Sequence, residues 1–585
     1  MSNIWMSSPL GPGAFVLTFL VAGLLTLLVG TALVLRYRRV VRQYMLEGAG
    51  GGATVALSIG EILATAKAAQ RPRLLLSYAD GDDSAGRSSE FRTARRAHLK
   101  AAIVYSAAGF SHAGVSTALW LWAASIEFDV LRILVIFWAF AWPVTLTLLI
   151  FWGPDRRRQF LTVMGYVGGL LALCVWVGAF SRAAPIVLGG GATPSITFPA
   201  YLQPLLVWVT LVWPSAFLLV FLNRRVRNVG PVVFLFMVFA VFGAQLVFLL
   251  ERTHLVMTWL VALSLFLAPI TNRATMIAIY GPQLLGVLLF SVPAWFFMRW
   301  IARRYALKRM SDQSIMIDSI WGLMTLFNVV DLVLDRGFMG WLGLVAFAGY
   351  KSAAVLGLRP LRKAAAERRV SRLLLLRVFG RRRHSERLFA LISAHWRYAG
   401  SIELIAGVDL ASTTLELRQF LDFLSGRLRL SFINDAADLQ KRLDKIDLAP
   451  DPDGRFRVNE FFCTSAAWQA AVTQLIGRTD VVLMDLRGFS ATNAGCIFEL
   501  QMLVSHIPLH RVVLLVDKST DHLLLENVLL GLVETIGGDD ASQLGVLNLD
   551  GNAARGVGQF LRLSEEMMPG ISPLLADVSD AGARA

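Results

Sequence analysis

Cysteine is nearly absent from this sequence, which has three cysteines in 585 residues. Cys174 lies within an apolar run, Cys463 and Cys496 lie far along the chain, and no two cysteines form a CxxC pair. Neither a disulfide framework nor a zinc site is therefore expected. The only close pair of histidines, His506 and His510, flanks a proline at a predicted helix end, so we predict no metal site there.

Charged residues are also scarce, at 17% of the chain, whereas 56% of the residues are hydrophobic. Soluble domains contain about 25% charged residues, so this composition argues against a soluble protein of this length. Apolar runs of about 20 residues, the length needed to cross about 30 Å of hydrocarbon, recur in the first half of the chain. The sequence therefore predicts a polytopic α-helical membrane domain, with spans at 14–35, 101–125, 130–152, 160–180, 204–222, 231–250, 255–271 and 276–298.

The predicted membrane domain begins with a first transmembrane helix in residues 1–35, with the N-terminus outside. No Lys or Arg precedes its apolar run, which is too long for a signal peptide. Residues 36–100, which are rich in glycine and charged residues, are predicted to be a cytoplasmic connector. Residues 101–298 contain the other predicted transmembrane helices. Residues 299–369 are predicted to be an amphipathic or membrane-associated linker. One or two further spans in this linker are left open, which gives eight to ten spans in total.

Positive charge follows several of the predicted spans, in clusters that begin at Arg36, Arg156 and Arg224, and the net charge is +15. Cytoplasmic loops carry an excess of Lys and Arg, so the clusters predict a multi-pass protein of the plasma (inner) membrane with a cytoplasmic C-terminal domain. Anionic lipid headgroups are the expected partners, and no nucleic-acid partner is expected. Counting spans puts Arg299–Arg309 outside, but its charge favours the inside. Two alternatives stay open: one candidate span between 230 and 298 is re-entrant, or the external placement of Arg299–Arg309 is real.

Ionisable residues inside the predicted spans are few, and the main ones are His112 and, at span boundaries, Asp129, Arg132 and Glu251. Pumps and ion carriers usually bury paired acids or a basic relay at mid-membrane, because only function sustains that cost. The sequence shows no such constellation. A transporter with a regulatory tail is therefore the lowest-ranked of the functions considered.

The pattern changes at about residue 370, where short apolar runs begin to alternate with helical patterns. Five such runs predict a parallel sheet with right-handed crossovers, at 373–379, 402–407, 481–486, 511–517 and 544–549. We predict that residues 370–570 form a cytoplasmic α/β three-layer domain with a five-stranded parallel, flavodoxin-like sheet in the order 2-1-3-4-5. Residues 431–464 are predicted to be an insertion, and residues 571–585 a flexible tail.

The segment Asp480–Leu500, DVVLMDLRGFSATNAGCIFEL, is the most informative part of this domain. An apolar run ends in Asp485, a loop follows, and a helical pattern that opens near Thr492 carries a single acid, Glu499. Open α/β sheets keep their ligand sites at the carboxyl ends of the strands. The pattern therefore predicts that Glu499 lies beside a ligand site.

The predicted helix has two faces. Cys496 and Glu499 share the face that we expect to meet the ligand, and Leu500 lies on the opposite face, which we expect to pack on the sheet. The first strand is adjacent to the third in a 2-1-3-4-5 sheet. The residues after its end are therefore expected, with Asp485, to contribute partners: Phe379, Gly380 and Arg381.

Residues 468–500 resemble the middle of a Toll/interleukin-1 receptor-type domain. In that family a helix with the pattern C-x-x-E-L follows the third strand, and Cys496, Glu499 and Leu500 match it, with Ser490 where the family often has Ser. The same residues resemble nucleoside 2-deoxyribosyltransferase-like proteins, in which D-V-V-x-x-D-L precedes an Asn/Gly loop and a helical Glu. The first strand, LLLLRVFG, departs from the acidic-aromatic-Ser-Tyr ending of the first family.

Both families use the helical Glu on an N-glycosidic bond, of NAD in one and of nucleosides in the other. The resemblance implies that Glu499 is catalytic and that NAD or a related nucleotide is a substrate, with no bound cofactor and no metal. It implies a membrane protein that acts in signalling or defence. It also implies a set of substrate-binding residues: Phe379, Gly380, Arg381, Asp485, Ser490 and Cys496.

A non-catalytic alternative stays open, in which the C-terminal domain is a membrane-anchored interaction module that forms a homo-oligomer. In this alternative Glu499 is a solvated side chain on an amphipathic helix, and Asp485 caps the next turn. A Glu499→Ala substitution would then leave the phenotype intact, whereas changes at the sheet edge would not.

Overall fold

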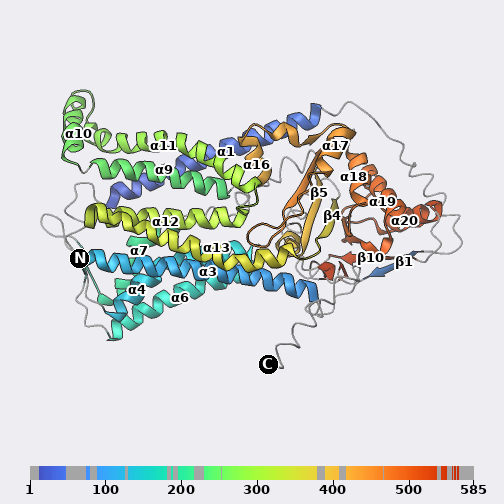
Figure 1. Cartoon of the computed structure of the whole chain (residues 1–585), viewed down its shortest axis with the longest axis horizontal. Helices are drawn as coiled ribbons and strands as arrows, with labels where there is room; N and C mark the ends of the chain where they lie inside the picture. Colours follow the sequence, from blue (N-terminus) through green and yellow to red (C-terminus); the bar gives the residue numbers. More distant parts are fainter. Residues whose placement is uncertain are drawn as a thin grey trace. The chain divides into compact units, whose positions relative to one another are not determined.

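The computed structural model describes most of the chain (Figure 1). The described residues are 12–47, 74–78, 89–125, 129–153, 155–180, 186–188, 196–216, 230–251, 253–377, 391–406, 417–464, 467–536, 542–549 and single positions at 389 and between 557 and 564. They form two compact units. The helical unit comprises Met1–Leu35, Ala101–Arg359 and Glu416–Ser425, and the α/β unit comprises Arg36–Lys100, Pro360–Leu415 and Gly426–Ala585.

The helical unit contains most of the long helices, three of which continue into residues of the α/β unit. Its elements are α1 (Pro12–Glu47), α3 (Ser89–Ala124), α4 (Val130–Phe140), α5 (Trp142–Trp152), α6 (Arg156–Phe180), β2 (Ile186–Leu188), β3 (Ile196–Phe198), η1 (Ala200–Leu202), α7 (Gln203–Ala216), α9 (Gly230–Glu251), α10 (His254–Leu267), α11 (Ala274–Ala306), α12 (Asp312–Arg336), η3 (Gly337–Gly343) and α13 (Leu344–Ala366).

Four helical segments among the described residues are long and apolar enough to cross a membrane: Val130–Trp152, Arg156–Phe180, Ala274–Ala306 and Asp312–Ala366. Three of the predicted spans, 130–152, 160–180 and 276–298, lie in these segments. A fifth candidate is the pair of α9 and α10, which is bent by 94° at a short break. These lengths and compositions are compatible with the predicted membrane association.

Residues 299–369, predicted to be an amphipathic or membrane-associated linker, contain α12 and α13. Buried side chains line α12 along most of its length, instead of the single apolar stripe of an amphipathic helix. Its acid Asp318 accepts a hydrogen bond from Tyr350 Oη of α13 at 3.0 Å and forms an ion pair with Lys351. Asp318 is therefore paired with residues of α13 within the helical unit.

α3 and α12 run in the same direction. His112 Nε2 of α3 lies 2.7 Å from Thr325 Oγ1 of α12, and Ser116 Oγ lies 3.3 Å from the other ring nitrogen. Further along both helices, Arg336 Nε donates to the carbonyl of Ala123 at 2.8 Å. The start of α12 is therefore level with the part of α3 near residue 101.

α11 and α13 run opposite to α12. Tyr305 Oη, near the end of α11, donates to Asp312 at the start of α12 at 2.8 Å. Gly357, near the end of α13, packs on Val104 of α3. The turn between α5 and α6 belongs to the same level, because the rings of Phe151 and Tyr105 lie 5.8 Å apart.

One end of the helical unit thus brings together Arg156–Arg158 and the basic segment Arg299–Arg309, and we call it the basic end. It holds the end of α11, the α5–α6 turn and the last helical-unit residues of α13. Its basic residues are Arg156, Arg157, Arg158, Arg299, Arg303, Arg304, Lys308, Arg309 and Arg359. Arg299–Arg309 therefore lies at the same end of the helical unit as the cluster that begins at Arg156.

The sequence predicts three spans between 230 and 298. In this region the structure has two antiparallel helices, α9 and α11, and a third helix, α10, that bends away from α9. α9 and α11 pack closely, since a Cβ on Gly243 would lie 2.4 Å from the carbonyl oxygen of Gly286. Only glycine permits this approach of the two backbones. α10, predicted to be a separate span, is the helix that bends away after α9.

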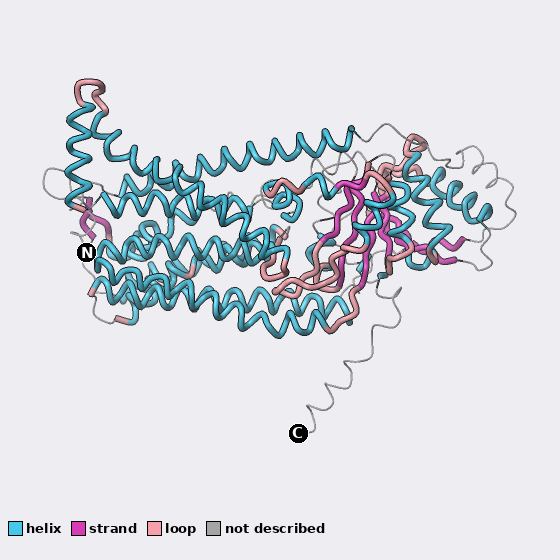
Figure 2. Tube along the Cα trace, turned by 45° about the horizontal axis from the view of Figure 1, so that its top comes forward, coloured by secondary structure: helices cyan, strands magenta, loops and turns pink. Residues whose placement is uncertain are grey.

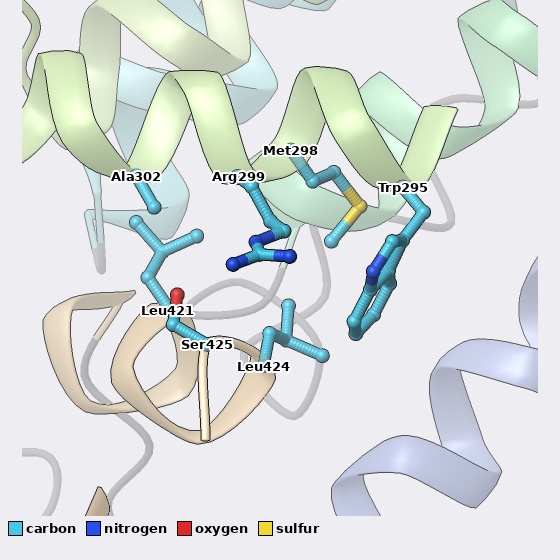
Figure 3. A pocket seen from close by; sticks show the side chains of 7 residues that line it. All are labelled: Trp295, Met298, Arg299, Ala302, Leu421, Leu424 and Ser425. Carbon is cyan, nitrogen blue, oxygen red and sulfur yellow. The ribbon is translucent and has the colours of Figure 1, made fainter. Parts of the chain in front are cut away.

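A short helix from the C-terminal part of the chain also belongs to the helical unit. α16 (Leu417–Leu424) follows the second strand of the main sheet in sequence, yet its Leu421 and Leu424 pack on Trp295 and Met298 of α11 (Figure 3). The space between these side chains is too small for a water molecule, so the contact is packing and not a ligand pocket. The chain re-enters the α/β unit directly afterwards, at Gly426.

The α/β unit contains one parallel sheet of eight strands in the order β1-β10-β9-β8-β4-β5-β7-β6 (Figure 2). The strands are β1 (Leu74–Tyr78), β4 (Ser371–Arg377), β5 (Gly400–Ala406), β6 (Phe432–Ile433), β7 (Val458–Cys463), β8 (Val481–Asp485), β9 (Val512–Val516) and β10 (Ser542–Asn548). The helices and 3-10 helices between them are η4 (Leu428–Ser431), α17 (Ala436–Leu443), α18 (Trp468–Ile476), α19 (Ala494–His506), η5 (Leu509–Arg511) and α20 (His522–Ile536).

The five predicted strands are all present as β4, β5, β8, β9 and β10, and their order β5-β4-β8-β9-β10 is the predicted 2-1-3-4-5. The predicted total of five strands is wrong. β6 and β7 come from the predicted insertion 431–464, and β1 comes from the predicted connector 36–100, where it pairs in parallel with β10. The predicted tail 571–585 lies outside the described residues.

Side chains on both faces of the sheet are buried, as a parallel sheet requires. On one face, alternate strand residues such as Leu374, Val482 and Leu514 form a continuous apolar cluster with residues of α17, α18, α19 and α20. On the other face Leu375 and Leu483 are also buried. The carboxyl ends of β4 and β8 lie side by side, because these strands pair in parallel register.

Candidate active site at the carboxyl end of β8

Asp485 is the last residue of β8 and is buried. Arg487 donates to both of its carboxylate oxygens, from Nε at 2.7 Å and from an Nη at 2.6 Å. Such two-pronged pairs hold both partners in a fixed geometry. The structure thus gives Asp485, predicted to be a substrate-binding residue, a partner two residues further along the chain.

The loop after β8 is fixed by its own hydrogen bonds. Gly488 has a φ of +79°, a conformation that favours glycine, and the Phe489 ring next to it is fully buried. The backbone N–H of Ser490 donates to Asn493 Oδ1 at 2.9 Å, and Ser490 Oγ lies 2.9 Å from Thr492 Oγ1. Ser490, also a predicted binding residue, is therefore half-buried and hydrogen-bonded within the loop.

Glu499 lies in the second turn of α19 and is 3% exposed. Among the described residues no basic side chain forms an ion pair with it, and its Oε2 has no hydrogen-bond partner. Burial alone raises the pKa of its carboxyl from 4.5 to about 8. The group is therefore protonated at neutral pH, and it is not the solvated side chain of the non-catalytic alternative.

The position of Glu499 on α19 follows from its neighbours. One stripe of the helix packs on α18, where the rings of Phe498 and Trp468 lie 5.3 Å apart. Another stripe, which includes Cys496 and Leu500, belongs to the apolar cluster on the sheet. Glu499 comes one residue after Phe498 and three after Cys496, so its side chain leaves the helix between these two stripes.

Cys496 was predicted to share the ligand-facing side with Glu499 and to lie opposite Leu500. In the structure Cys496 is 1% exposed and lies in the same apolar cluster as Leu500 and Ile497. Burial raises the pKa of its thiol well above the usual value, and nearby Glu499 and Asp485 raise it further. A small apolar side chain four residues before Leu500 naturally joins the same stripe.

The other predicted binding residues, Phe379, Gly380 and Arg381, lie outside the described residues. The described part of β4 ends at Arg377, which pairs in register with Asp485 of β8. The end of β4 therefore lies next to Asp485, as the predicted strand order requires.

Arg487 and Glu403 are buried groups of the α/β unit that were not anticipated from the sequence. Arg487 was seen only as part of a loop, although an Arg two residues after an Asp is within reach of it. Glu403 of β5 is fully buried with Arg372 Nε at 3.5 Å, and burial raises the pKa of its carboxyl to about 7 in spite of that cation. Its sequence context, an acid inside a strand pattern, gave no signal of a partner.

These two carboxyl groups predict how stability depends on pH. The unfolded chain ionises Glu499 and Glu403 near pH 4.5, whereas the folded chain keeps them protonated up to about pH 8 and about pH 7. Between these pH values the folded state therefore binds more protons than the unfolded state. The free energy of unfolding should fall with rising pH by up to about 1.4 kcal/mol per pH unit for each group, from about pH 4.5 to about pH 8 for Glu499 and to about pH 7 for Glu403.

The measurement is the urea concentration at which Cys496 becomes accessible to a thiol reagent, compared at several pH values for the full-length protein and for Glu499→Gln. We expect the variant to show a shallower decline above about pH 5, because glutamine does not ionise. Identical pH profiles for the two proteins would contradict a protonated Glu499.

The site thus combines a fixed Asp485–Arg487 pair, a hydrogen-bonded loop and an unpaired buried acid, Glu499. The resemblance of residues 468–500 to Toll/interleukin-1 receptor-type and nucleoside 2-deoxyribosyltransferase-like proteins stays a prediction. In comparisons with models of protein families, with curated proteins and with solved structures, the chain matches none of them.

Proposed function

We propose that this chain is an integral membrane protein whose cytoplasmic α/β unit cleaves the N-glycosidic bond of NAD or a related nucleotide, with Glu499 as the reacting carboxyl group. The observation that supports the proposal is that Glu499 is buried on α19, the helix that follows β8, and that among the described residues no cation or hydrogen-bond donor contacts its Oε2. Unpaired buried acids are costly, and groups with strongly shifted pKa values concentrate at functional sites.

The chemistry of NAD suits such a group. Its nicotinamide ring is a pyridinium cation, and an opposite charge nearby lowers the pKa of a carboxyl, so the arrival of the substrate would release the proton of Glu499 to solvent. The bond between the ribose C1′ and the ring nitrogen then breaks, and its electron pair goes to the nitrogen, which becomes neutral.

Positive charge thereby moves to the ribose, next to the carboxylate. Glu499 would stabilise this oxocarbenium-like centre or bond to C1′, as glycosidase carboxylates do. The oxygen of a water molecule then bonds to C1′ and its proton leaves, so NAD and water give nicotinamide and ADP-ribose. A neutral nucleoside would use the same group differently, by taking its proton onto the departing base.

The location in the membrane is proposed from the helical unit. Its four candidate spans include helices that bring Arg156–Arg158 and Arg299–Arg309 to one end, and membrane proteins keep such basic clusters on the cytoplasmic side. α16 packs on α11 next to Arg299 at this end, and the chain continues from α16 into the α/β unit. We therefore assign the basic end and the α/β unit to the cytoplasm, with anionic lipid headgroups around the basic residues.

This topology predicts the outcome of a labelling experiment, because all three native cysteines are buried. Leu307→Cys places an exposed thiol at the basic end, and Phe338→Cys places one at the other end of α12. A membrane-impermeant thiol reagent should label only Phe338→Cys in intact cells, and both variants after permeabilisation. Labelling of Leu307→Cys alone in intact cells would reverse the proposed orientation.

The proposed activity is tested with purified full-length protein in detergent and in vesicles of high protein density, since the α/β unit is expected to form a homo-oligomer. The protein is incubated with NAD, NADP and the common nucleosides, and the released base is quantified by chromatography. We expect release from at least one of these substrates. No release from any of them in either state would favour the interaction module.

A further inference from the structure

The helical unit also contains a buried acid, at the end of α9. Glu251, the last residue of α9, is fully buried, and its Oε2 accepts a hydrogen bond of 3.0 Å from Gln283 Nε2 of α11. Gln283 is buried as well, and Glu251 Oε1 has no hydrogen-bond partner in the part of the chain that the structure describes. One carboxylate oxygen is therefore oriented by an amide, while the other is enclosed without a donor.

The backbone around Glu251 adds negative potential. The carboxyl end of a helix carries a partial negative charge of about half an electron, so an acid there is unfavourable unless a positive charge is bound nearby. Helix α9 ends at Glu251, and α10 follows after a short break at an angle of 94° to α9. Thr253 closes the end of the helix with two hydrogen bonds to the carbonyl of Leu250, at 3.0 Å from its N–H and 2.7 Å from its Oγ1.

Rigid neighbours hold this arrangement in place. Leu249 of α9, Tyr280 of α11 and Val330 of α12 pack together one turn or less from the acid and the amide. Asp331 follows Val330 on α12, so a further acid lies at this end of the helical unit. Among the described residues no Lys, Arg or His forms an ion pair with Glu251.

We propose that Glu251, oriented by Gln283, is a binding site for a small monovalent metal cation at the break between α9 and α10. Hard cations prefer carboxylate and carbonyl oxygens, and broken helices in membranes bind such ions at their carboxyl ends. A divalent ion needs more acids, and the described residues contain no group of three or more His, Cys, Asp or Glu that could hold one. The inference is independent of the chemistry proposed for Glu499.

The test measures thermal unfolding of the purified full-length protein in Na⁺, Li⁺, K⁺ and choline chloride at one pH and one ionic strength. A ligand that binds only the folded state raises the unfolding midpoint with the logarithm of its concentration. We expect at least one metal cation to raise the midpoint in this way relative to choline, and Glu251→Gln to lose the rise. Asp129→Asn, which changes an exposed acid at the same end, should keep it.

Gln283→Ala provides a second variant, because it keeps the carboxylate but removes the amide that orients it. We expect this variant to require a higher concentration of the same cation for half of the effect. Equal midpoints in all four salts, which is the result if Glu251 holds only a proton, would overturn the proposal. A cation-dependent rise that persists in Glu251→Gln would overturn it as well.

Discussion

Replacing Glu499 with glutamine is expected to lower the rate of base release by at least about 10²–10³-fold while the α/β unit stays folded. Glutamine has nearly the same shape, and in the resting site it replaces a carboxyl that burial already keeps uncharged. It cannot become the carboxylate that faces the ribose when the glycosidic bond breaks. The measurement is the turnover number of the full-length variant on the substrate that the wild type cleaves.

Glu534→Gln on α20 is the matched control, because it makes the same chemical change at a half-buried acid. It should keep the wild-type rate. Folding of both variants is checked by the urea concentration that exposes Cys496. A Glu499→Gln variant that is folded and fully active would assign the cleavage to another group.

Asp485→Ala is expected to destabilise the α/β unit by about 3–5 kcal/mol, the largest effect on stability predicted for this chain. Arg487 is 9% exposed and would remain buried without its carboxylate partner. Removing one member of a buried ion pair is costly because the other charge is left uncompensated. The cost is measured by urea denaturation with Cys496 as the reporter.

The double variant Asp485→Leu with Arg487→Met tests the reason for this loss. Both charges are removed together, so we expect it to recover much of the stability that Asp485→Ala loses. If Asp485→Ala instead keeps its stability and raises the KM for the nucleotide, then Asp485 binds substrate, as the resemblance implied, and the pairing with Arg487 is secondary.

The central strands of the sheet were predictable because their residues are apolar on both faces. Runs such as VVLMD in β8 and VVLLV in β9 are buried at every position, and that pattern is typical of inner parallel strands. β7 was missed because Asn459 and Glu460 interrupt its apolar run. In the structure the Asn459 side chain is buried and hydrogen-bonded to the backbone of Asp447, so its polarity does not mark a loop.

The helical unit shows a similar limit. Hydropathy alone gave three spans between 230 and 298, because α10 is as apolar as a true span. In the structure α10 is bent by 94° relative to α9 after Glu251, and no local pattern of residues predicts this bend. The basic charge of Arg299–Arg309 predicts that this segment shares a side with the cluster that begins at Arg156, and in the structure both lie at one end of the helical unit.

The sequence predicted that Glu499 lies on the helix after β8, but not that its side chain is buried without an ion-pair partner among the described residues. A helix after β8 and an acid in its second turn followed from the residue pattern. The burial of Glu499 depends on α18, because Trp468 of α18 packs beside Phe498 and Gly495 of α19. The spacing of residues in the sequence does not predict this tertiary contact. The pair of Asp485 with Arg487 was equally hidden, because an acid at a strand end is as typical of a turn cap as of an ion pair.

The most direct test of the proposed role of Glu499 is the release of nicotinamide from NAD by the full-length protein, reconstituted in vesicles at high density. We expect nicotinamide and ADP-ribose to accumulate in equal amounts with the wild type, and neither to form with Glu499→Gln. Accumulation at the same rate with both proteins, or no nicotinamide from folded wild-type protein at any density, would contradict the account.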